Sequence, residues 1–214
     1  MLSLLPGVYN TIRSSYIYAY NHWLRLSLRT SNDYSYTKDY VTMHVRNWQV
    51  WLADWVGKPE VRFLEIGSHE GRSAVWFLQN VLTHPTSTLD CIDLFTGKGL
   101  EPRFDHNILK SGRRGQVRKH KGRSDAILPE LPEAYFDVIY VDGSHRAADV
   151  LLDAALSWRL LKCNGLIIFD DYLWEMSKPA AQRPQIAIDL FLEAYALRLR
   201  VVHHGYQVVV QRTS

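Results

Sequence analysis

Short β-branched runs and longer amphipathic stretches alternate along the chain from about residue 60 to the C-terminus. This change of hydrophobic period predicts strands separated by helices. The runs "FDVIYV" and "GLIIF" are apolar at nearly every position, as expected for central strands of a parallel sheet that helices cover on both faces. Strands are predicted over residues 61–66, 88–93, 116–120, 136–141 and 165–169.

The last apolar segment, residues 198–212, has a turn signal at Gly205 in its middle. Two strands joined by a short turn run antiparallel, so the last strand is expected to oppose the others. The chain contains no repeats and no linker rich in Pro, Gly or Ser. The predicted fold class is α/β: a Rossmann-like, seven-stranded, mostly parallel sheet with the last strand antiparallel and helices on both faces.

Aromatic residues recur at helical spacing in the first 60 residues, which predicts two helices. We expect residues 1–60 to form a helical cap belonging to the same domain as residues 61–214. An aromatic stripe is more typical of a packing face than of a membrane-surface helix, and a homo-oligomer through these helices is one possible use of it. The stripe residues are Tyr16, Tyr20, Trp23 and Leu24 in the first helix and Trp48, Trp51 and Trp55 in the second.

The composition suits one well-buried core, since 47% of the 214 residues are hydrophobic. No run approaches the roughly 18 to 20 apolar residues that span a bilayer, and the N-terminus lacks the features of a signal peptide. Cys91 and Cys163 lie in apolar surroundings without metal-ligand spacing and are predicted to be small core residues. These features favour a soluble cytoplasmic protein.

Positive charge is concentrated in residues 110–123, which hold seven of the 25 Lys and Arg residues and no acid. This basic strip could bind an anionic substrate, such as a nucleotide-linked group or a glycan polyanion. A solvated helix-to-strand connection is the favoured interpretation, because charge runs usually face water. Nucleic acid is disfavoured, since no aromatic side chains interleave with the charges to stack on bases.

The segment "RFLEIGSHEGRS" carries Glu65, Gly67 and Gly71 where a dinucleotide fold has its glycine-rich turn. A nicotinamide site needs glycine-x-glycine in that turn, and a carboxylate beside it would repel a pyrophosphate. A carboxylate suits a cationic ligand that offers hydrogen-bond donors. S-adenosylmethionine (SAM) has a sulfonium and an ammonium group and fits this description. His69, inside the turn, is interpreted as a structural residue close to the cofactor.

Carboxylates recur where the other predicted strands end, at Asp93, Asp142, Asp170 and Asp171. Ligands of open parallel sheets bind beyond the carboxyl ends of the strands, so these acids are expected in one crevice. Crowded carboxylates repel each other unless a cation or a shared proton lies among them. Oxygen donors favour a hard ion, with Mg²⁺ ahead of Mn²⁺ and Ca²⁺.

The glycine segment resembles motif I of the class I SAM-dependent methyltransferases, and the resemblance extends over roughly residues 60–212. It implies SAM as cofactor, with Asp93 at the ribose and Ser124 and Asp125 at the adenine edge; Ser124 could also cap the following helix. The full set of cofactor-binding residues that it implies is Glu65, Gly67, Ser68, Gly71, Ser73, Asp93, Ser124, Asp125 and Asp142.

The pair "YVDGSH" and "IIFDDY" resembles a branch of this family that contains the macrocin and mycinamicin sugar O-methyltransferases. The resemblance implies that Asp142, Asp170 and Asp171 hold Mg²⁺ (or Mn²⁺), and that His145 is the general base next to Asp142 in the catalytic centre. Catechol-type O-methyltransferases share the metal pattern, but the second member of the pair is usually an asparagine there. Asp171 therefore favours a sugar-like hydroxyl.

The sequence thus predicts an enzyme that transfers methyl from SAM to a hydroxyl of a sugar, glycan or similar polyol with the help of a divalent metal. A catechol or phenol O-methyltransferase, a SAM-binding protein without catalysis and a nicotinamide oxidoreductase are the alternatives. The acceptor pocket is expected to include Phe95, Phe104 and Trp174.

Overall fold

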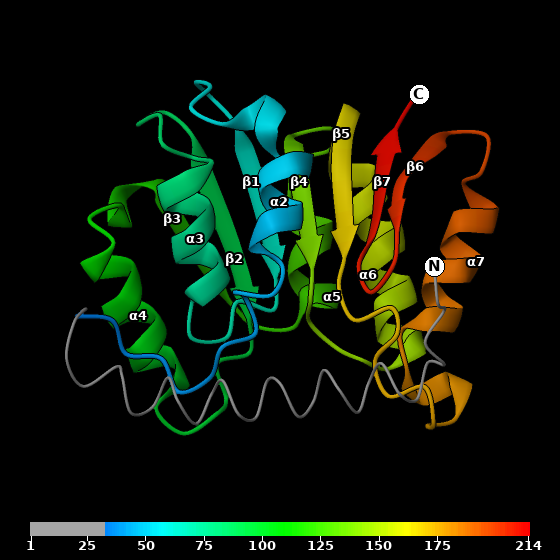
Figure 1. The fold of residues 1–214 in the computed structure, drawn as a ribbon, viewed down its shortest axis with the longest axis horizontal. Helices are drawn as coiled ribbons and strands as arrows, with labels where there is room; N and C mark the ends of the chain where they lie inside the picture. Colours follow the sequence, from blue (N-terminus) through cyan, green and yellow to red (C-terminus); the bar gives the residue numbers. More distant parts are fainter. Residues whose placement is uncertain (1–32) are drawn as a thin grey trace.

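Seven strands form one sheet in the order β3-β2-β1-β4-β5-β7-β6 in the computed structural model, which describes residues 33–214 (Figure 1). β7 runs antiparallel to both of its neighbours, β5 and β6, and all other neighbouring strands are parallel. The predicted fold class is therefore confirmed. The strands are β1 (Arg62–Ile66), β2 (Thr88–Asp93), β3 (Val117–Lys121), β4 (Phe136–Val141), β5 (Leu161–Phe169), β6 (Leu199–His204) and β7 (Val208–Arg212).

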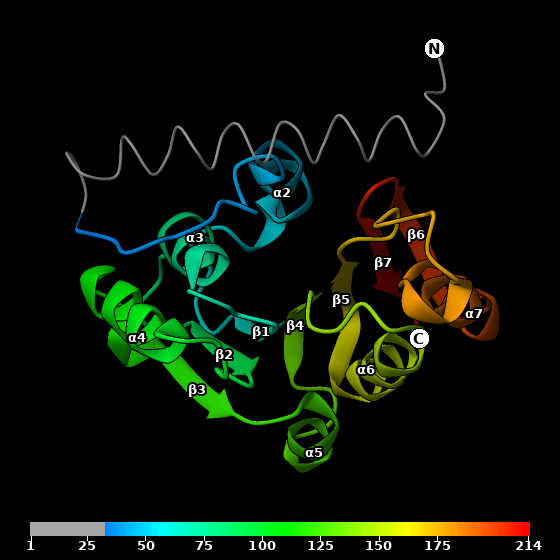
Figure 2. The same ribbon diagram turned by 90° about the horizontal axis from the view of Figure 1, so that it is seen from below.

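Helices cover both faces of the sheet: α2, α3 and α4 on one side, and α5, α6 and α7 on the other (Figure 2). Each layer buries its own hydrophobic cluster against the sheet. The α-helices are α2 (Val45–Trp51), α3 (Arg72–Asn80), α4 (Leu100–Lys110), α5 (Ser124–Ile127), α6 (Ala147–Leu160) and α7 (Gln185–Ala194). Short 3-10 helices span Ala53–Trp55, Arg114–Gln116, Leu128–Glu130 and Ala180–Gln182.

The central strands are buried on both faces, as their continuous apolar runs predict. In β1, Phe63 packs into one hydrophobic cluster and Leu64 into the other, because successive side chains of a strand point to opposite faces. Neighbouring β4 repeats this arrangement with Val138 and Ile139, and all four side chains are fully buried. Since β1 and β4 are adjacent, the chain order reverses between them, which is where open α/β sheets bind ligands.

β5 begins at Leu161, four residues before the predicted start. The segment 162–165 bulges out of the β4–β5 ladder and interrupts the apolar pattern, so the sequence does not show this first part of the strand. Asn164 in this bulge adopts φ 65°, a left-handed backbone that Asn tolerates better than most residues. The bulge turns Cys163 outward, where it is exposed. The prediction of a core position is therefore wrong for Cys163 and correct for Cys91, which is buried.

The second aromatic helix predicted for the cap corresponds to α2 and the 3-10 turn after it. Trp48 is fully buried against α3 and β4 and donates its indole N–H to Gln207 Oε1 at 3.0 Å. The first predicted helix, with Tyr16 and Trp23, lies outside the described residues. Within residues 33–214, no helix has both the length and the apolar character needed to cross a bilayer.

Candidate active site

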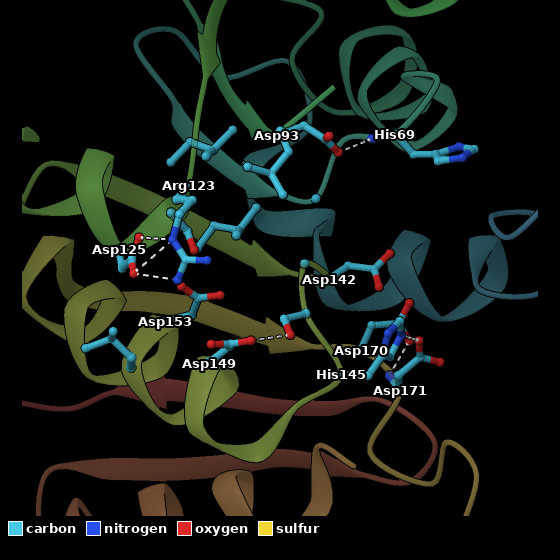
Figure 3. Close-up of a pocket in the computed structure, with 18 of the residues that line it drawn as sticks. His69, Asp93, Arg123, Asp125, Asp142, His145, Asp149, Asp153, Asp170 and Asp171 are labelled. Atoms are coloured by element: carbon cyan, nitrogen blue, oxygen red, sulfur yellow. Dashed lines mark hydrogen bonds and ion pairs between the residues drawn. The ribbon is translucent and has the colours of Figure 1, made fainter. Parts of the chain in front are cut away.

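A cavity of about 690 Å³ opens at the carboxyl ends of the strands. Segments that follow β1, β2, β3, β4 and β5 all contribute to it, together with one face of α6 (Figure 3). The sequence-predicted residues that line it are Gly67, Asp93, Ser124, Asp125, Asp142, His145, Asp170, Asp171 and Trp174. Glu65, Ser68, Gly71 and Ser73 are absent from its wall.

Gly67 brings the turn after β1 into direct contact with the turn after β4. It adopts φ 92°, and a Cβ atom there would lie 2.0 Å from the carbonyl oxygen of Asp142. The contact is held from both sides, because Gly67 N–H donates to Ile92 O and Asp142 N–H donates to Ile66 O, each at 2.8 Å. Only glycine fits such a position, so the two turns form a rigid floor under the cavity.

Glu65 lies beneath this floor, fully buried, and does not reach the cavity. Burial raises the pKa of Glu65 to about 7, although the neighbouring hydroxyls of Ser68 and Ser73 oppose the shift. The Cys91 thiol lies 3.6 Å from Glu65 Oε2. The predicted direct contact between Glu65 and a cationic ligand therefore needs correction: residue 65 lies inside β1, and its side chain points into the core.

Asp93 lies on the cavity wall, where the sequence places an acid for the ribose. Its Oδ2 accepts the N–H of His69 at 2.8 Å, and its Oδ1 accepts the N–H of Phe95 at 2.7 Å. Both oxygens are thus oriented by backbone groups of the two turns that flank them. His69 has φ 47°, an uncommon conformation outside glycine that places its N–H toward Asp93.

Ser124 and Asp125 begin α5, and Asp125 lies at the far end of the cavity from His145 (Figure 3). Ser124 makes no capping bond, since the N-cap position belongs to Arg123. The Arg123 guanidinium binds Asp125 with two nitrogens, Nη2 at 2.7 Å and Nε at 3.0 Å. Asp153 of α6 lies behind them. Burial raises the pKa of Asp153 to about 6, although a hydrogen bond with Ser124 acts to lower it.

At the opposite end, acids after β4 and β5 meet around His145 (Figure 3). His145 Nε2 lies 2.7 Å from Asp171 Oδ2, and its ring stacks on Trp174 with centroids 4.2 Å apart. Burial, together with the negative charges of Asp170 and Asp171, raises the pKa of Asp142 well above its usual range. Carboxylate oxygens of Asp142 and Asp171 lie within 4.8 Å of each other, close enough to repel, as the sequence predicts.

Donor atoms of Asp142, His145 and Asp171 all lie within 4.8 Å of one another, a spacing that one divalent cation can bridge. Asp170 is engaged differently: its Oδ2 accepts the Tyr140 hydroxyl at 2.6 Å, and its Oδ1 accepts the backbone N–H of Asp171 at 2.7 Å. The donor atoms of Asp142, His145 and Asp171 thus fit one cation, whereas Asp170, to which the resemblance also assigns the metal, is not in that group of donors.

Several cavity residues escaped the sequence reasoning. Asp149 and Asp153 are four residues apart on α6 and both face the cavity, a spacing that the helical pattern could have revealed. Tyr206, which is not part of the cavity wall, donates to Asp171 Oδ1 from the turn before β7, and no local sequence signal marks it. Phe95 and Phe104, expected to line the acceptor pocket, instead pack together in the core with ring centroids 4.9 Å apart, and neither lines the cavity.

The seven basic side chains of the strip 110–123 all have partners. Lys119 and Lys121 bind acids of α4, with Lys119 Nζ 2.7 Å from Asp105 and Lys121 Nζ 2.5 Å from Glu101. Arg118 lies 3.5 Å from the buried Asp90. The other partners are Asp33 for Lys110, backbone carbonyls for Arg113 and Arg114, and Asp125 for Arg123.

The chain resembles known proteins in fold and in sequence. TomG, an O-methyltransferase from Streptomyces achromogenes involved in tomaymycin synthesis and solved with SAM, shares 18% identity over 82% of both chains with a TM-score of 0.65. An O-methyltransferase from Bacillus cereus, solved with S-adenosylhomocysteine (SAH), shares 14% identity with a TM-score of 0.64, over 92% of this chain and 90% of that one. These likenesses show the fold.

Protein R132 of Acanthamoeba polyphaga mimivirus is 31% identical over 127 residues, and the match spans 56% of each chain. The profile of the methyltransferase domain family matches residues 64–172, about half of the 214 residues. That stretch begins in β1, includes the glycine turn and ends just after the acidic pair that follows β5. The chain therefore belongs to the methyltransferase domain family.

Proposed function

We propose that the protein is a SAM-dependent O-methyltransferase whose cavity holds SAM between the glycine turn and α5. The observation that carries the proposal is that the turn after β1 and the acids after β4 and β5 line a single cavity. The bound SAM would rest on the backbone of Gly67, with Asp93 available to the ribose hydroxyls and Asp125 to the adenine edge. Glu65 supports this site from below rather than touching the ligand.

A divalent cation, Mg²⁺ or Mn²⁺, is proposed at the acidic end. Asp142 and Asp171 would hold it, with His145 or Asp170 as the third donor, because all four groups converge there. When bound, the cation would act as a Lewis acid that stabilises negative charge on the acceptor oxygen. It would also relieve the repulsion among the carboxylates that raises the pKa of Asp142.

His145 is the proposed general base. An ionised Asp171 can accept a hydrogen bond but cannot donate one, so in the proposed tautomer His145 Nε2 would donate to Asp171 at 2.7 Å and Nδ1 would be the acceptor. The acceptor hydroxyl would give its proton to Nδ1 while its oxygen attacks the methyl carbon of SAM. The bond between carbon and sulfur breaks, and SAH leaves with the electron pair. The chain's contribution is alignment and proton removal.

The proposed acceptor is a sugar, a glycan or a similar polyol. The support is the pair Asp170 and Asp171 together with His145, which resemble the sugar O-methyltransferase branch. A catechol or phenol acceptor is the second candidate, since the acidic metal pattern is compatible with it.

The test is a methyl-transfer assay on the purified full chain with SAM and a panel of neutral methyl glycosides and catechol, followed by mass spectrometry. We expect one added methylene mass on a glycoside, loss of the product in excess chelator and its return with Mg²⁺. Methylation of catechol alone would favour the phenol alternative. Binding of SAM without transfer to any acceptor would favour a non-catalytic protein. Full turnover in excess chelator would show that the reaction needs no divalent metal.

A further inference from the structure

Residues 33–44 form an irregular segment, here called the strap, that runs past α4 and α3 to the start of α2 (Figures 1 and 2). Tyr40 of the strap lines the cavity beside His69, with ring centroids 6.2 Å apart. His44, near its end, places Nε2 3.7 Å from Asp170 Oδ2. The strap therefore connects the glycine turn to the acidic end of the cavity.

A buried carboxylate of the glycine turn fastens the strap. Glu70 is 1% exposed, and its oxygens accept the Thr37 N–H at 2.6 Å and the Thr37 hydroxyl at 2.7 Å. Arg103 of α4 adds Nε at 2.5 Å. Burial acts to raise the pKa of Glu70, but the bonds from Thr37 and Arg103 outweigh it and lower the pKa, so the group is ionised. A buried charge of this kind requires its partners in place.

Asn107 ties the same three parts together through its amide. Its Oδ1 accepts the Ser35 N–H at 2.6 Å, and its Nδ2 donates to Ser35 O at 3.0 Å and to Glu70 O at 2.8 Å. The Asn107 side chain is fully buried, which strengthens these bonds. The strap, the glycine turn and α4 thus behave as one unit around Glu70.

We propose that Glu70 is a positioning residue for methyl transfer: by holding Thr37 it sets the strap so that Tyr40 forms the wall facing the acceptor. The inference rests on the proposed function of the cavity. Tyr40 is 39% exposed and lines the same cavity as the turn expected to hold SAM and the acids expected to act on the acceptor. Releasing the strap should therefore weaken acceptor binding more than SAM binding or the chemical step.

A double-mutant cycle between Glu70→Gln and Tyr40→Ala tests this on the full chain. With the most active methyl glycoside of the panel, we expect each single variant to raise KM about tenfold, while kcat and the Kd for SAH change less than about twofold. The double variant should be no worse than either single one, because both remove the same wall. Lys110→Ala is the matched control: it breaks the exposed pair with Asp33 of the strap and should change nothing.

Additive effects in the double variant, or a rise in the Kd for SAH as large as the rise in KM, would overturn the proposal. Hydrogen exchange gives a readout without any acceptor: Glu70→Gln should speed exchange in residues 34–44 about tenfold and leave residues 62–66 unchanged. Unchanged exchange in the strap would also overturn it. Thr37→Val removes one bond to Glu70 and serves if Glu70→Gln does not fold. Failure of the wild-type chain to bind SAH would instead reject the proposed function.

Discussion

The cavity wall built by β1 and β2 presents Asp93 with a backbone N–H on each oxygen, whereas the wall built by β4 and β5 crowds Asp142, Asp170 and Asp171 together. At the first wall, the chain itself supplies a hydrogen-bond donor to each oxygen of Asp93. At the second wall, burial and neighbouring negative charge raise the pKa of Asp142. We therefore expect shape to hold a ligand at the first wall, and a proton or a cation to be needed among the acids of the second.

Replacing His145 should have the largest effect and would act on the acidic wall alone. We expect His145→Ala to lower turnover about 10²- to 10⁴-fold, the range for loss of a general base, with the Kd for SAH unchanged. Mn²⁺ binding by electron paramagnetic resonance separates the two roles open to this residue. Unchanged Mn²⁺ affinity fits a base, while a strong loss would make His145 a metal ligand and leave Asp170 outside the metal site.

Gly67→Ala acts on the floor, where the two walls meet. The new Cβ would lie 2.0 Å from the Asp142 carbonyl oxygen, on a residue with a left-handed backbone. We therefore expect the free energy of unfolding to fall by about 2 to 4 kcal/mol, and SAH binding to weaken as well. Denaturant unfolding and calorimetry measure both quantities. Gly115→Ala is the control, because nothing lies within 4 Å of its Cβ position. Equal behaviour of the two variants would show that the floor is not rigid.

The third prediction concerns pH and the support beneath the floor. The folded pKa of Glu65, about 7, lies above the ordinary value of 4.5, so its contribution to stability is full below pH 4.5 and is lost as pH rises through 7. Glu65→Gln removes this dependence. We expect the variant to be more stable than wild type at pH 8, by at most about 3 kcal/mol, and equal to it near pH 4.5. A constant difference across pH, measured by urea unfolding, would contradict this.

The smallest effect is expected outside both walls, in the basic strip. Lys121 is 54% exposed and paired with Glu101 at the surface, so Lys121→Ala should leave the urea midpoint and the KM for a neutral glycoside unchanged. The same variant assayed on a sugar phosphate sharpens the comparison. A KM rise confined to the phosphate would mean that the strip, rather than the cavity alone, selects acceptors.

The sheet was predictable because its signals are local. Continuous apolar runs identify β4 and β5 as central strands, and acids at strand ends must meet at one edge when the strands are parallel. The same logic brings Asp93, Asp142 and Asp171 to one cavity. These conclusions need only the period of the sequence and the direction of the strands.

The contacts that the sequence did not reveal depend on groups that lie far apart along the chain. Glu65 lies within β1, so strand alternation turns it into the core rather than beyond the strand end. Asp170 binds Tyr140 of the neighbouring strand, a contact fixed by β4–β5 pairing and invisible along the chain. The hydrogen bonds from Thr37 to Glu70 join residues that lie 33 positions apart along the chain, and Thr37 belongs to no motif.

The contact between Gly67 and the Asp142 carbonyl also limits how this cavity could evolve. Residue 67 has no room for a side chain, and glycine has none to shorten. Substitution at this position therefore cannot adjust the cavity to a larger or a smaller acceptor. Tyr40 and Trp174 come from irregular segments and meet no such restriction. Adaptation to a new acceptor, in nature or in a directed-evolution library, should therefore accumulate substitutions in those two segments while the floor stays constant.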